Sequence, residues 1–537
     1  MSRLLTIAGF VLLILLARAP VPSFGQTLTA GPQDLNTTPS YAETIELCRR
    51  LAEVSPMVTY TSFGKSHQLR DLPLIIVDRN GHTTPGEVRA SGNIVLLVQA
   101  AIHPGEPAGK DAGLRLLRDM VIHNKHQGIL EHLTLLFIPI FNVDGHERFG
   151  PFNRINQNGP EEMGWRTNAL NLNLNRDYLK ADSDEMRHWL ALWNGWEPDF
   201  FIDTHSTNGG DYQYTMTYML ETWGNMDEAL TAWCEQVFLP HWEQAMEEGG
   251  YPVFPYVSYR NWHDPRSGLV SRPSPPALST GYTPQRNRPG LLLETHMLKP
   301  YPLRVESTYL TILETMKLLN QQHREFKKLV EQADALSASP GFRTKPFPLD
   351  FTNSGDSVMV DFLGVEYRQK TSSLSGGQWF IYEKDQPVTY SIPWFNKMVV
   401  SREVMLPEAY IIPVEWEEVI RRLQHHGVAT QRTGGDLTIE VGSYRFENVR
   451  LSASVNEGRQ TARFTAIPTT ETRTFPAGSV IIEMNQATAR VIAHALEPDA
   501  PSSFAYWGLF NTIFQRTEYF ESYMMENMAR QMLEDDP

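Results

Sequence analysis

The sequence predicts an α/β fold: a mixed, mostly buried sheet flanked by helices, followed by a C-terminal α+β accessory domain. Two observations predict it. From Tyr41 to about Ser337, short apolar runs alternate with amphipathic helical runs, which is the pattern of a sheet covered by helices. After a stretch rich in Ser, Pro, Gly and Thr at 339–356, the pattern changes to partly buried strands and short helices.

The core strands are expected at compact apolar runs, because strands that are buried on both faces are apolar throughout. Between two of these runs, residues 108–123 place Leu114, Leu117, Met120 and Val121 on one helical face, which predicts an amphipathic helix. The expected strands are 74–77, 94–99, 133–138, 200–203 and 291–294.

The composition of 339–356 marks it as a linker between two domains. We expect the main α/β domain at 26–338 and the α+β accessory domain at 357–537. In the accessory domain, a helical stripe from Trp416 to Leu423 ends before Gly427, and residues 437–441 alternate as a half-buried strand. Nothing in this second domain indicates catalytic chemistry.

Two further patterns in the C-terminal region have simple structural interpretations. The segment 504–533, rich in Met and aromatic residues, is predicted to be helical. His425 and His426 are interpreted as cations near the C-terminal end of a helix. Four methionines have near-helical spacing and are expected to pack against the body of the protein, namely Met524, Met525, Met528 and Met532.

The charge and cysteine content exclude several classes of protein. The 62 acidic and 47 basic residues give a net charge of −15, which argues against nonspecific binding to nucleic acid or anionic membranes. Cys48 and Cys234 are the two cysteines. They can pair with each other or remain as buried thiols, but two cysteines cannot build a disulfide scaffold or a multi-cysteine zinc module.

The first 25 residues have the pattern of a cleavable secretory signal peptide. Arg3 precedes an apolar run at 4–17, and Ser23-Phe24-Gly25 supplies small residues for a cleavage site. The apolar run has 14 residues, which is shorter than the about 20 residues needed to span a membrane. We therefore expect a secreted or periplasmic protein without a stable membrane span.

Polar residues with metal-binding chemistry lie at the ends of the expected strands. His103 and Glu106 follow the strand 94–99, His205 follows 200–203, and Glu294 ends 291–294. Zinc accepts His and Glu ligands and commonly has three protein ligands in catalytic sites. Any one of these motifs alone is more simply a structural His or ion pair. Their occurrence in order at strand ends of one sheet favours a functional site.

Here the sequence resembles a known family, the M14 zinc carboxypeptidases. The resemblance covers roughly the first three-fifths of the chain, and its motifs keep the family's order. It implies the zinc carboxypeptidase fold and a metallocarboxypeptidase activity on a peptide or small carboxylate-bearing amide. The matching motifs are His103-Pro104-Gly105-Glu106, Pro139-Ile140-Phe141-Asn142-Val143-Asp144-Gly145, Trp165-Arg166, Leu174-Asn175-Arg176, His205-Ser206 and the strand that ends in Glu294.

The resemblance implies a metal site and a general base. His103, Glu106 and His205 match the three zinc ligands, which implies one Zn²⁺ per chain with a fourth position for water. Glu294 matches the general base that takes a proton from that water and later delivers one to the leaving amine. Zinc lowers the pKa of bound water to about 7, so a glutamate beside it can act near neutral pH.

The resemblance also implies residues that bind the substrate. Arg166 matches the cation that stabilises the tetrahedral oxyanion. Asn175 and Arg176 match the pair that grips the terminal carboxylate, and the planar fork of Arg176 suits a carboxylate in a way that Lys would not. Tyr282 is our candidate for the tyrosine that covers bound substrate, with Tyr256 or Tyr259 as alternatives.

Three departures indicate a divergent branch rather than the digestive enzymes. Pro104-Gly105 stands where the digestive enzymes carry an Arg between the first two ligands. Asn173 stands where family members often have an Asp that supports a zinc-bound His, and a neutral partner should raise ligand basicity less. Thr207 replaces the family's usual Tyr after the third-ligand His-Ser pair.

Two alternatives stand beside this function. The same chemistry could hydrolyse another carboxylate-bearing amide, such as a cell-wall peptide or an N-acyl amino acid. A secreted binding protein on the same fold is the non-catalytic alternative. Inactive relatives usually lose a ligand or the base, whereas this chain keeps all of them.

Overall fold

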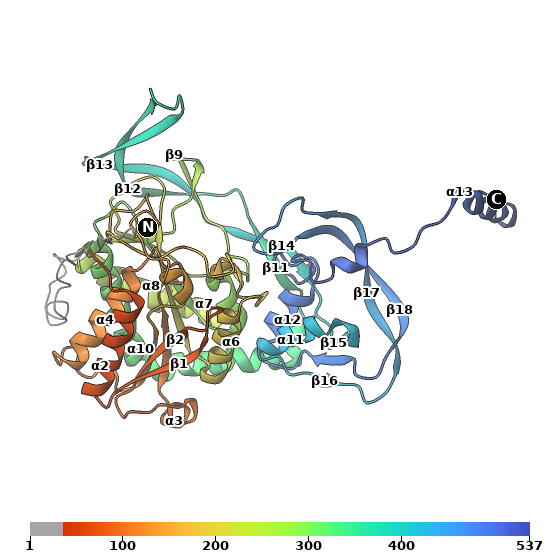
Figure 1. The fold of residues 1–537 in the computed structure, drawn as a ribbon, viewed down its shortest axis with the longest axis horizontal. Helices are drawn as coiled ribbons and strands as arrows, with labels where there is room; N and C mark the ends of the chain where they lie inside the picture. The colour runs from red at the N-terminus through yellow and green to blue at the C-terminus, as the bar shows by residue number, and fades with distance from the viewer. Residues whose placement is uncertain (1–35, 537) are drawn as a thin grey trace, which may run out of the picture.

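The structure is a computed structural model that describes residues 36–536, and its centre is a mixed sheet of eight strands (Figure 1). In order across the sheet, the strands are β1 (Val58–Lys65), β2 (Asp71–Val77), β4 (Leu133–Ile138), β3 (Ile94–Gln99), β5 (Phe200–Thr207), β10 (Gly290–His296), β6 (Met216–Met219) and β7 (Val253–Pro255). Strand β3 pairs in parallel with β4 and β5, and β5 pairs in parallel with β10. The carboxyl ends of β3, β5 and β10 therefore reach one edge of the sheet.

The sheet confirms the predicted α/β fold class and all five predicted strands. Three strands are longer than their apolar runs. Strand β2 begins at Asp71, β5 continues through His205, and β10 continues past Glu294 to His296. The backbone ladder continues because Glu294 lies opposite His205 in the parallel register. These two side chains thus lie on strands rather than on the loops that follow them.

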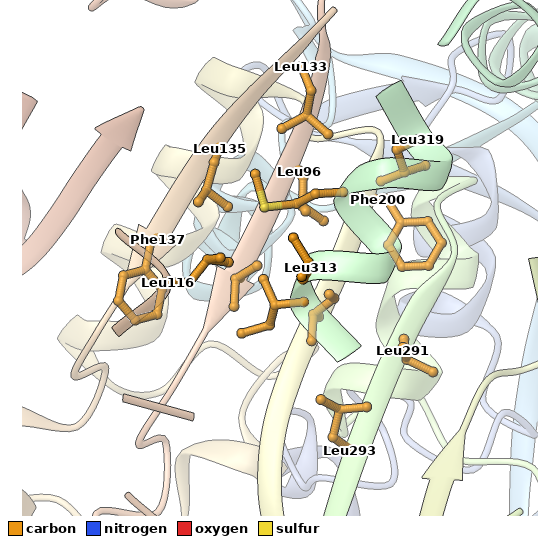
Figure 2. Packing of buried hydrophobic residues seen from close by; sticks show 14 of the residues in the cluster. Leu96, Leu116, Leu133, Leu135, Phe137, Phe200, Leu291, Leu293, Leu313 and Leu319 are labelled. Carbon is orange, nitrogen blue, oxygen red and sulfur yellow. The ribbon is translucent and has the colours of Figure 1, made fainter. Parts of the chain in front are cut away.

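One face of the sheet packs against helices from the first three-fifths of the chain. Figure 2 shows Leu96 of β3, Leu135 of β4 and Phe200 of β5 in the same apolar cluster as Leu313 and Leu319 of a long helix. Because each of these side chains is nearly or fully buried, this cluster is the main hydrophobic core. The helices are α2 (Tyr41–Val54), α4 (Ala108–Val121), α7 (Glu228–Trp233), α8 (Leu239–Glu248) and α10 (Tyr301–Ala338), and α4 confirms the predicted amphipathic helix.

The opposite face packs against one helix from the residues up to 338, called the main region here, and two from residues 339–536, called the C-terminal region. Phe201 of β5 contacts Trp189 and Trp193, which lie on one helix. The same apolar cluster contains Ile420 and Ile492 from the C-terminal region, so that region covers part of this face. The helices are α6 (Asp184–Trp196), α11 (Glu417–His425) and α12 (Ala489–Leu496).

The C-terminal region is rich in strands, and one of its hairpins pairs with the main region. Trp394 is the register partner of Leu269, which joins the hairpin to an earlier strand. The domain division at 339–356 stays a prediction. The further strands are β8 (Tyr259–Asn261), β9 (Asp264–Val270), β11 (Phe347–Asn353), β12 (Val358–Thr371), β13 (Gln378–Phe395), β14 (Met398–Val404), β15 (Ala409–Ile412), β16 (Gln431–Arg432), β17 (Leu437–Leu451), β18 (Ala462–Phe475) and β19 (Val480–Glu483).

Several short helices complete the described chain. The α-helical ones are α3 (Pro85–Ser91), α5 (Val143–His146), α9 (Ser279–Tyr282) and α13 (Ser522–Asp535). The others are η2 (Leu174–Arg176), η3 (Cys234–Phe238), η4 (Thr283–Arg286), η5 (Pro340–Arg343), η6 (Val414–Trp416) and η7 (Asn511–Phe514).

The C-terminal segment differs from its predicted packing. The helix α13 covers only the last part of 504–533 and lies away from the body of the protein (Figure 1). The expectation that its methionines pack against the body is wrong, since Met525 is 51% and Met532 68% exposed. Helical spacing gave the four methionines one face but could not show whether a partner surface lies within reach.

The structure also bears on the predicted helix and strand of the C-terminal region, on the two cysteines and on membrane spans. The predicted helix before Gly427 and the strand at 437–441 are confirmed as α11 and part of β17, although Ile439 is 43% exposed. Cys48 and Cys234 are buried free thiols. Among residues 36–536, no helix is both long and apolar enough to cross a membrane. The predicted signal peptide lies outside these residues.

Candidate metal centre and active site

The first two candidate ligands lie in a tight turn after β3. The backbone N–H of Glu106 donates to the carbonyl of His103 at 2.8 Å, which brings the two side chains to one side of the turn. Gly105 between them is required by packing, because a Cβ atom there would lie 2.4 Å from Cγ of Arg154. The motif therefore keeps a glycine so that an arginine from a distant loop can approach.

The third candidate ligand lies on β5 beside a carboxylate that the sequence analysis did not assign. Side chains two residues apart on a strand point to the same face, so Asp203 and His205 lie together. Oδ2 of Asp203 lies 2.9 Å from Nε2 of His205. The other oxygen of Asp203 accepts from the amide of Gln99 at 3.1 Å. The Asp-x-His spacing is the signal by which Asp203 could have been found.

The three candidate ligands converge in a buried cluster. Nδ1 of His103 and Nδ1 of His205 are 3.2 Å apart. The Glu106 carboxylate reaches both, with Oε1 at 3.2 Å from His103 and Oε2 at 3.1 Å from His205. Their ligand atoms all lie within 4.8 Å of one another. The structure thus brings together the residues that the sequence predicts as metal ligands.

In each of the two imidazoles, a hydrogen bond from Nε2 to a partner outside the cluster fixes Nδ1 as the nitrogen that faces the cluster. Nε2 of His103 donates to Oδ1 of Asn173 at 2.9 Å, and Nε2 of His205 donates to Asp203. Both partner oxygens can only accept, so each Nε2 carries a hydrogen, and each Nδ1 is left as the nitrogen that can bind a metal. Two imidazole nitrogens and one carboxylate in a buried site fit the donor set of catalytic zinc.

The two imidazoles differ in charge environment. Burial lowers the pKa of His103 to about 4, against the opposing effect of Glu106. Burial would also lower the pKa of His205, but the charges of Asp203 and Glu106 raise it well above its usual value. The two pKa values differ because the hydrogen-bond partner of Nε2 is neutral for His103 (Asn173) and an anion for His205 (Asp203). His205 is therefore the more basic ligand of the pair.

Glu294 lies opposite His205 on β10 and has an unusual environment. Burial raises the pKa of its carboxyl to about 8; Glu106 adds to the shift, while His205, Arg154 and Arg166 oppose it. Among the described residues, its Oε2 atom is buried without a hydrogen-bond partner. A buried carboxylate with a free oxygen and a raised pKa can exchange a proton near neutral pH.

Two arginines lie against the cluster, and the motif Trp165-Arg166 predicts one of them. Nη1 of Arg166 lies 3.4 Å from Nδ1 of His103, and its side chain is 41% exposed, so it can also meet a ligand. Arg154 was missed. Its Nη1 lies 2.8 Å from Oε1 of Glu106, and no spacing in the sequence indicates this contact.

The predicted carboxylate-binding pair borders the cluster. Nδ2 of Asn175 lies 3.3 Å from Nε2 of His205, and Oδ1 of Asn175 accepts from the backbone N–H of Ser279 at 2.9 Å. Nη1 of Arg176 donates to the carbonyl of Asn175. Burial and the nearby Arg166 lower the pKa of Arg176, and the negative charge of Glu294 opposes them.

The structure does not bring Tyr282 to the cluster. Tyr282 is fully buried, and its hydroxyl lies 2.8 Å from Nδ1 of His426. The interpretation of His426 as a cation is wrong, since burial lowers its pKa to about 3. Of the two alternatives, Tyr256 lies closer to the candidate site. Its hydroxyl is 3.4 Å from Oγ1 of Thr207, and the charge of Glu294 adds to burial in raising its pKa.

Comparisons with known proteins find a family model and relatives that are described as carboxypeptidases. A family model described as zinc carboxypeptidase, peptidase family M14, matches residues 44–225. Carboxypeptidase 2 of Trichophyton rubrum is 24% identical over 92% of this chain and 88% of its own length. Carboxypeptidase 2 of Trichophyton equinum is 24% identical over 90% of this chain and 86% of its own.

Solved structures with detectable similarity carry related descriptions. A metallo-carboxypeptidase from Pseudomonas aeruginosa has a TM-score of 0.38 at 18% identity, over 54% of this chain and 70% of that chain. Carboxypeptidase A from Helicoverpa armigera has a TM-score of 0.39 at 14% identity, over 57% and 77%. The family match over residues 44–225, and relatives aligned along most of their length, support membership of the M14 zinc carboxypeptidase family and a metallocarboxypeptidase activity.

Proposed function

We propose that this metallocarboxypeptidase releases the C-terminal residue of peptides, with Glu294 as general base and one zinc ion per chain. The observation that carries the proposal is the position of Glu294. Glu294 lies on the strand beside His205, next to the three-ligand cluster. Its Oε2 atom has no hydrogen-bond partner among the described residues, and its pKa is raised. His103 and His205 through Nδ1, together with the Glu106 carboxylate, would hold the zinc.

Zinc, when bound at such a site, polarises a carbonyl and lowers the pKa of a water molecule. Glu294 takes a proton from the attacking water as the new C–O bond forms. The C–N bond then breaks, and Glu294 returns the proton to the leaving amine. Arg166 lies against His103 and Glu106, where its cation can stabilise the oxyanion that develops on the carbonyl oxygen.

Recognition of a free C-terminus rests on the residues beside the cluster. We assign the substrate carboxylate to Arg176, whose guanidinium can make two parallel hydrogen bonds to it. Asn175 assists from the adjacent position, and its amide is held by Ser279. We assign substrate contact to Tyr256 rather than Tyr282, because the hydroxyl of Tyr256 lies 3.4 Å from Oγ1 of Thr207, two residues after His205 on β5.

Export of the protein is a further part of the proposal. It rests on the sequence pattern of Arg3, the apolar run at 4–17 and the small residues before position 26. Mass spectrometry of the mature N-terminus from the native host tests it. Cleavage after Gly25 supports export, and a mature chain that starts at Met1 contradicts it.

The activity itself is tested with a pair of peptides that differ only at the C-terminus. The zinc-loaded full chain is incubated with a peptide that ends in a free carboxylate and with the same peptide as its C-terminal amide. We expect release of one residue from the free acid and at least about a 100-fold slower reaction with the amide, since Arg176 then lacks its partner. Equal cleavage of both, or internal fragments, would contradict the assignment.

A further inference from the structure

A turn from the C-terminal region reaches the candidate active site. It joins β17 to β18 and is closed by two backbone hydrogen bonds between Asn456 and Arg459, of 2.8 and 2.9 Å. The two central residues, Glu457 and Gly458, have φ angles of +47° and +80°. Glycine adopts this conformation freely, whereas a glutamate rarely does, and such outliers often lie at functional positions.

The turn is fastened to the main region by a charged anchor. Arg459 donates to both carboxylate oxygens of Asp182, and Arg422 also contacts Asp182 at 2.9 Å. Burial would raise the pKa of Asp182, but these cations, together with Lys180, hold it at about 2. Asp182 is therefore ionised at physiological pH, and the anchor persists whenever the two regions are folded together.

The tip of the turn touches the segment that carries the carboxylate-binding pair. Oε2 of Glu457 accepts from the backbone N–H of Asn173 at 3.1 Å. Gly458 packs so closely on Leu172 that an added Cβ atom would lie 2.9 Å from its Cδ2. Asn173 in turn accepts from His103 and from the backbone of Asn175. Glu457 is thus two hydrogen bonds away from a candidate metal ligand.

The charge of Glu457 also acts on the candidate carboxylate site. Its carboxylate raises the pKa of Arg176 against the larger lowering effects of burial and of Arg166. Among the described residues, its second oxygen, Oε1, has no hydrogen-bond partner. The side chain of Glu457 is partly exposed. A substrate whose α-carboxylate is held by Arg176 places its own side chain, which branches from the adjacent carbon, near this negative charge.

We infer that Glu457, supplied by the C-terminal region, is a specificity residue of the active site that disfavours substrates with an acidic C-terminal side chain. It has two separable effects. As a hydrogen-bond acceptor it positions Asn173 and the residues that follow, and as an anion it repels a second carboxylate on the substrate. The inference rests on the proposed function of Arg176 and gives the C-terminal region a role in substrate choice.

The experiment uses peptides that end in Gln or in Glu, because these residues have nearly the same shape and differ in charge. In the wild-type full chain we expect a higher kcat/KM for the Gln peptide. Glu457→Gln keeps an acceptor for Asn173 and removes the charge, and we expect it to reduce the Gln-to-Glu preference by about five-fold, as for an exposed charge pair. Glu457→Ala should reduce the preference equally and also lower kcat/KM for both peptides, since the acceptor is lost.

The matched control is Glu447→Gln, an exposed glutamate on the same hairpin that pairs with Arg445. It changes the net charge of the chain by the same amount and should leave the preference unchanged. Thermal melting confirms that all variants are folded. An unchanged preference in Glu457→Gln would overturn the inference, and so would an equal change in Glu447→Gln.

A binding measurement separates this inference from the proposed function. Calorimetry on zinc-loaded Glu294→Gln protein, in which we expect turnover to be slow, gives the Kd of both peptides with and without the additional Glu457→Gln change. We expect the Gln-to-Glu ratio of affinities to fall about five-fold with Glu457→Gln. If the wild-type chain cleaves no peptide but this ratio shifts, the proposed catalysis fails and Glu457 keeps its role. Equal ratios in an active enzyme refute Glu457 alone.

Discussion

Glu294 and His205 lie directly opposite each other on the parallel strands β10 and β5. This register puts a candidate base beside a candidate ligand without relying on a loop, and strands hold such geometry more rigidly than loops do. The same arrangement explains why Glu294 ends an apolar run. The strand delivers the carboxylate to the edge of the sheet where the turn after β3 presents His103 and Glu106.

The charge on the outer partner of His205 should control metal affinity. Asp203→Asn keeps the hydrogen bond to Nε2 but removes the anion, so we expect zinc to bind about 10- to 100-fold more weakly. Chelator competition on the purified protein measures the Kd. Asn173→Asp is the matched change at His103 and should tighten binding, because it supplies the missing anion there. Unchanged affinity in Asp203→Asn would contradict this account of the site.

The shape of the Arg176 guanidinium should matter beyond its charge. Arg176→Lys keeps a cation but loses the planar fork, so we expect kcat/KM for a free-acid peptide to fall about 10- to 100-fold, mainly through KM. Steady-state kinetics on a series of peptide concentrations separates KM from kcat. Arg450→Lys, an exposed residue on β17, serves as the control. A fall in kcat with KM unchanged would show that Arg176 does not bind the ground-state carboxylate.

Acid should weaken the contact between the two regions through His426. Nε2 of His426 donates to the carbonyl of Leu179 at 2.8 Å, and its folded-state pKa is about 3. Its unfolded pKa is about 6.5. The stability that neutral His426 contributes to the folded state is complete above pH 6.5. It is lost as pH falls toward 3, by about 1.4 kcal/mol per pH unit, because only the unfolded state binds the proton in this range.

The measurement for His426 is the free energy of unfolding in denaturant between pH 7 and pH 5, with chelator present to remove the effect of zinc. We expect His426→Gln to reduce the slope of the free energy of unfolding against pH, relative to the wild type, by the equivalent of about one bound proton. His494, whose pKa is also lowered to about 3, leaves a residual slope in both proteins. Identical slopes for variant and wild type would mean that His426 is protonated in the folded state.

The sequence predicts local features of the site well and long-range contacts poorly. The turn from His103 to Glu106 follows a strand, and the strand that ends in Glu294 is apolar, so both can be recognised from neighbouring residues. Arg154 and Glu457 meet the site across large distances in the chain, and no periodicity or spacing signals such contacts. Their positions depend on how the loops and the C-terminal region pack.

Tyr282 and the C-terminal methionines show the same limit. Tyr282 precedes Glu294 in the sequence and is the sequence-based candidate for the tyrosine that covers substrate, but it ends the short helix α9 and is buried against His426 instead. The methionines of α13 form a helical face that predicts packing, and the helix lies away from the body. In each case the local pattern is real, and tertiary placement decides what it contacts.

The measurement that tests the central claim most directly is the activity and zinc content of Glu294→Gln. The amide has the same shape as the carboxyl but cannot accept the proton, so we expect kcat to fall by about 10²- to 10⁴-fold with one zinc ion still bound per chain. Parallel elemental analysis and kinetics on one preparation give both values. Full zinc with near wild-type turnover would contradict the assignment of Glu294 as the base and, with it, the proposed mechanism.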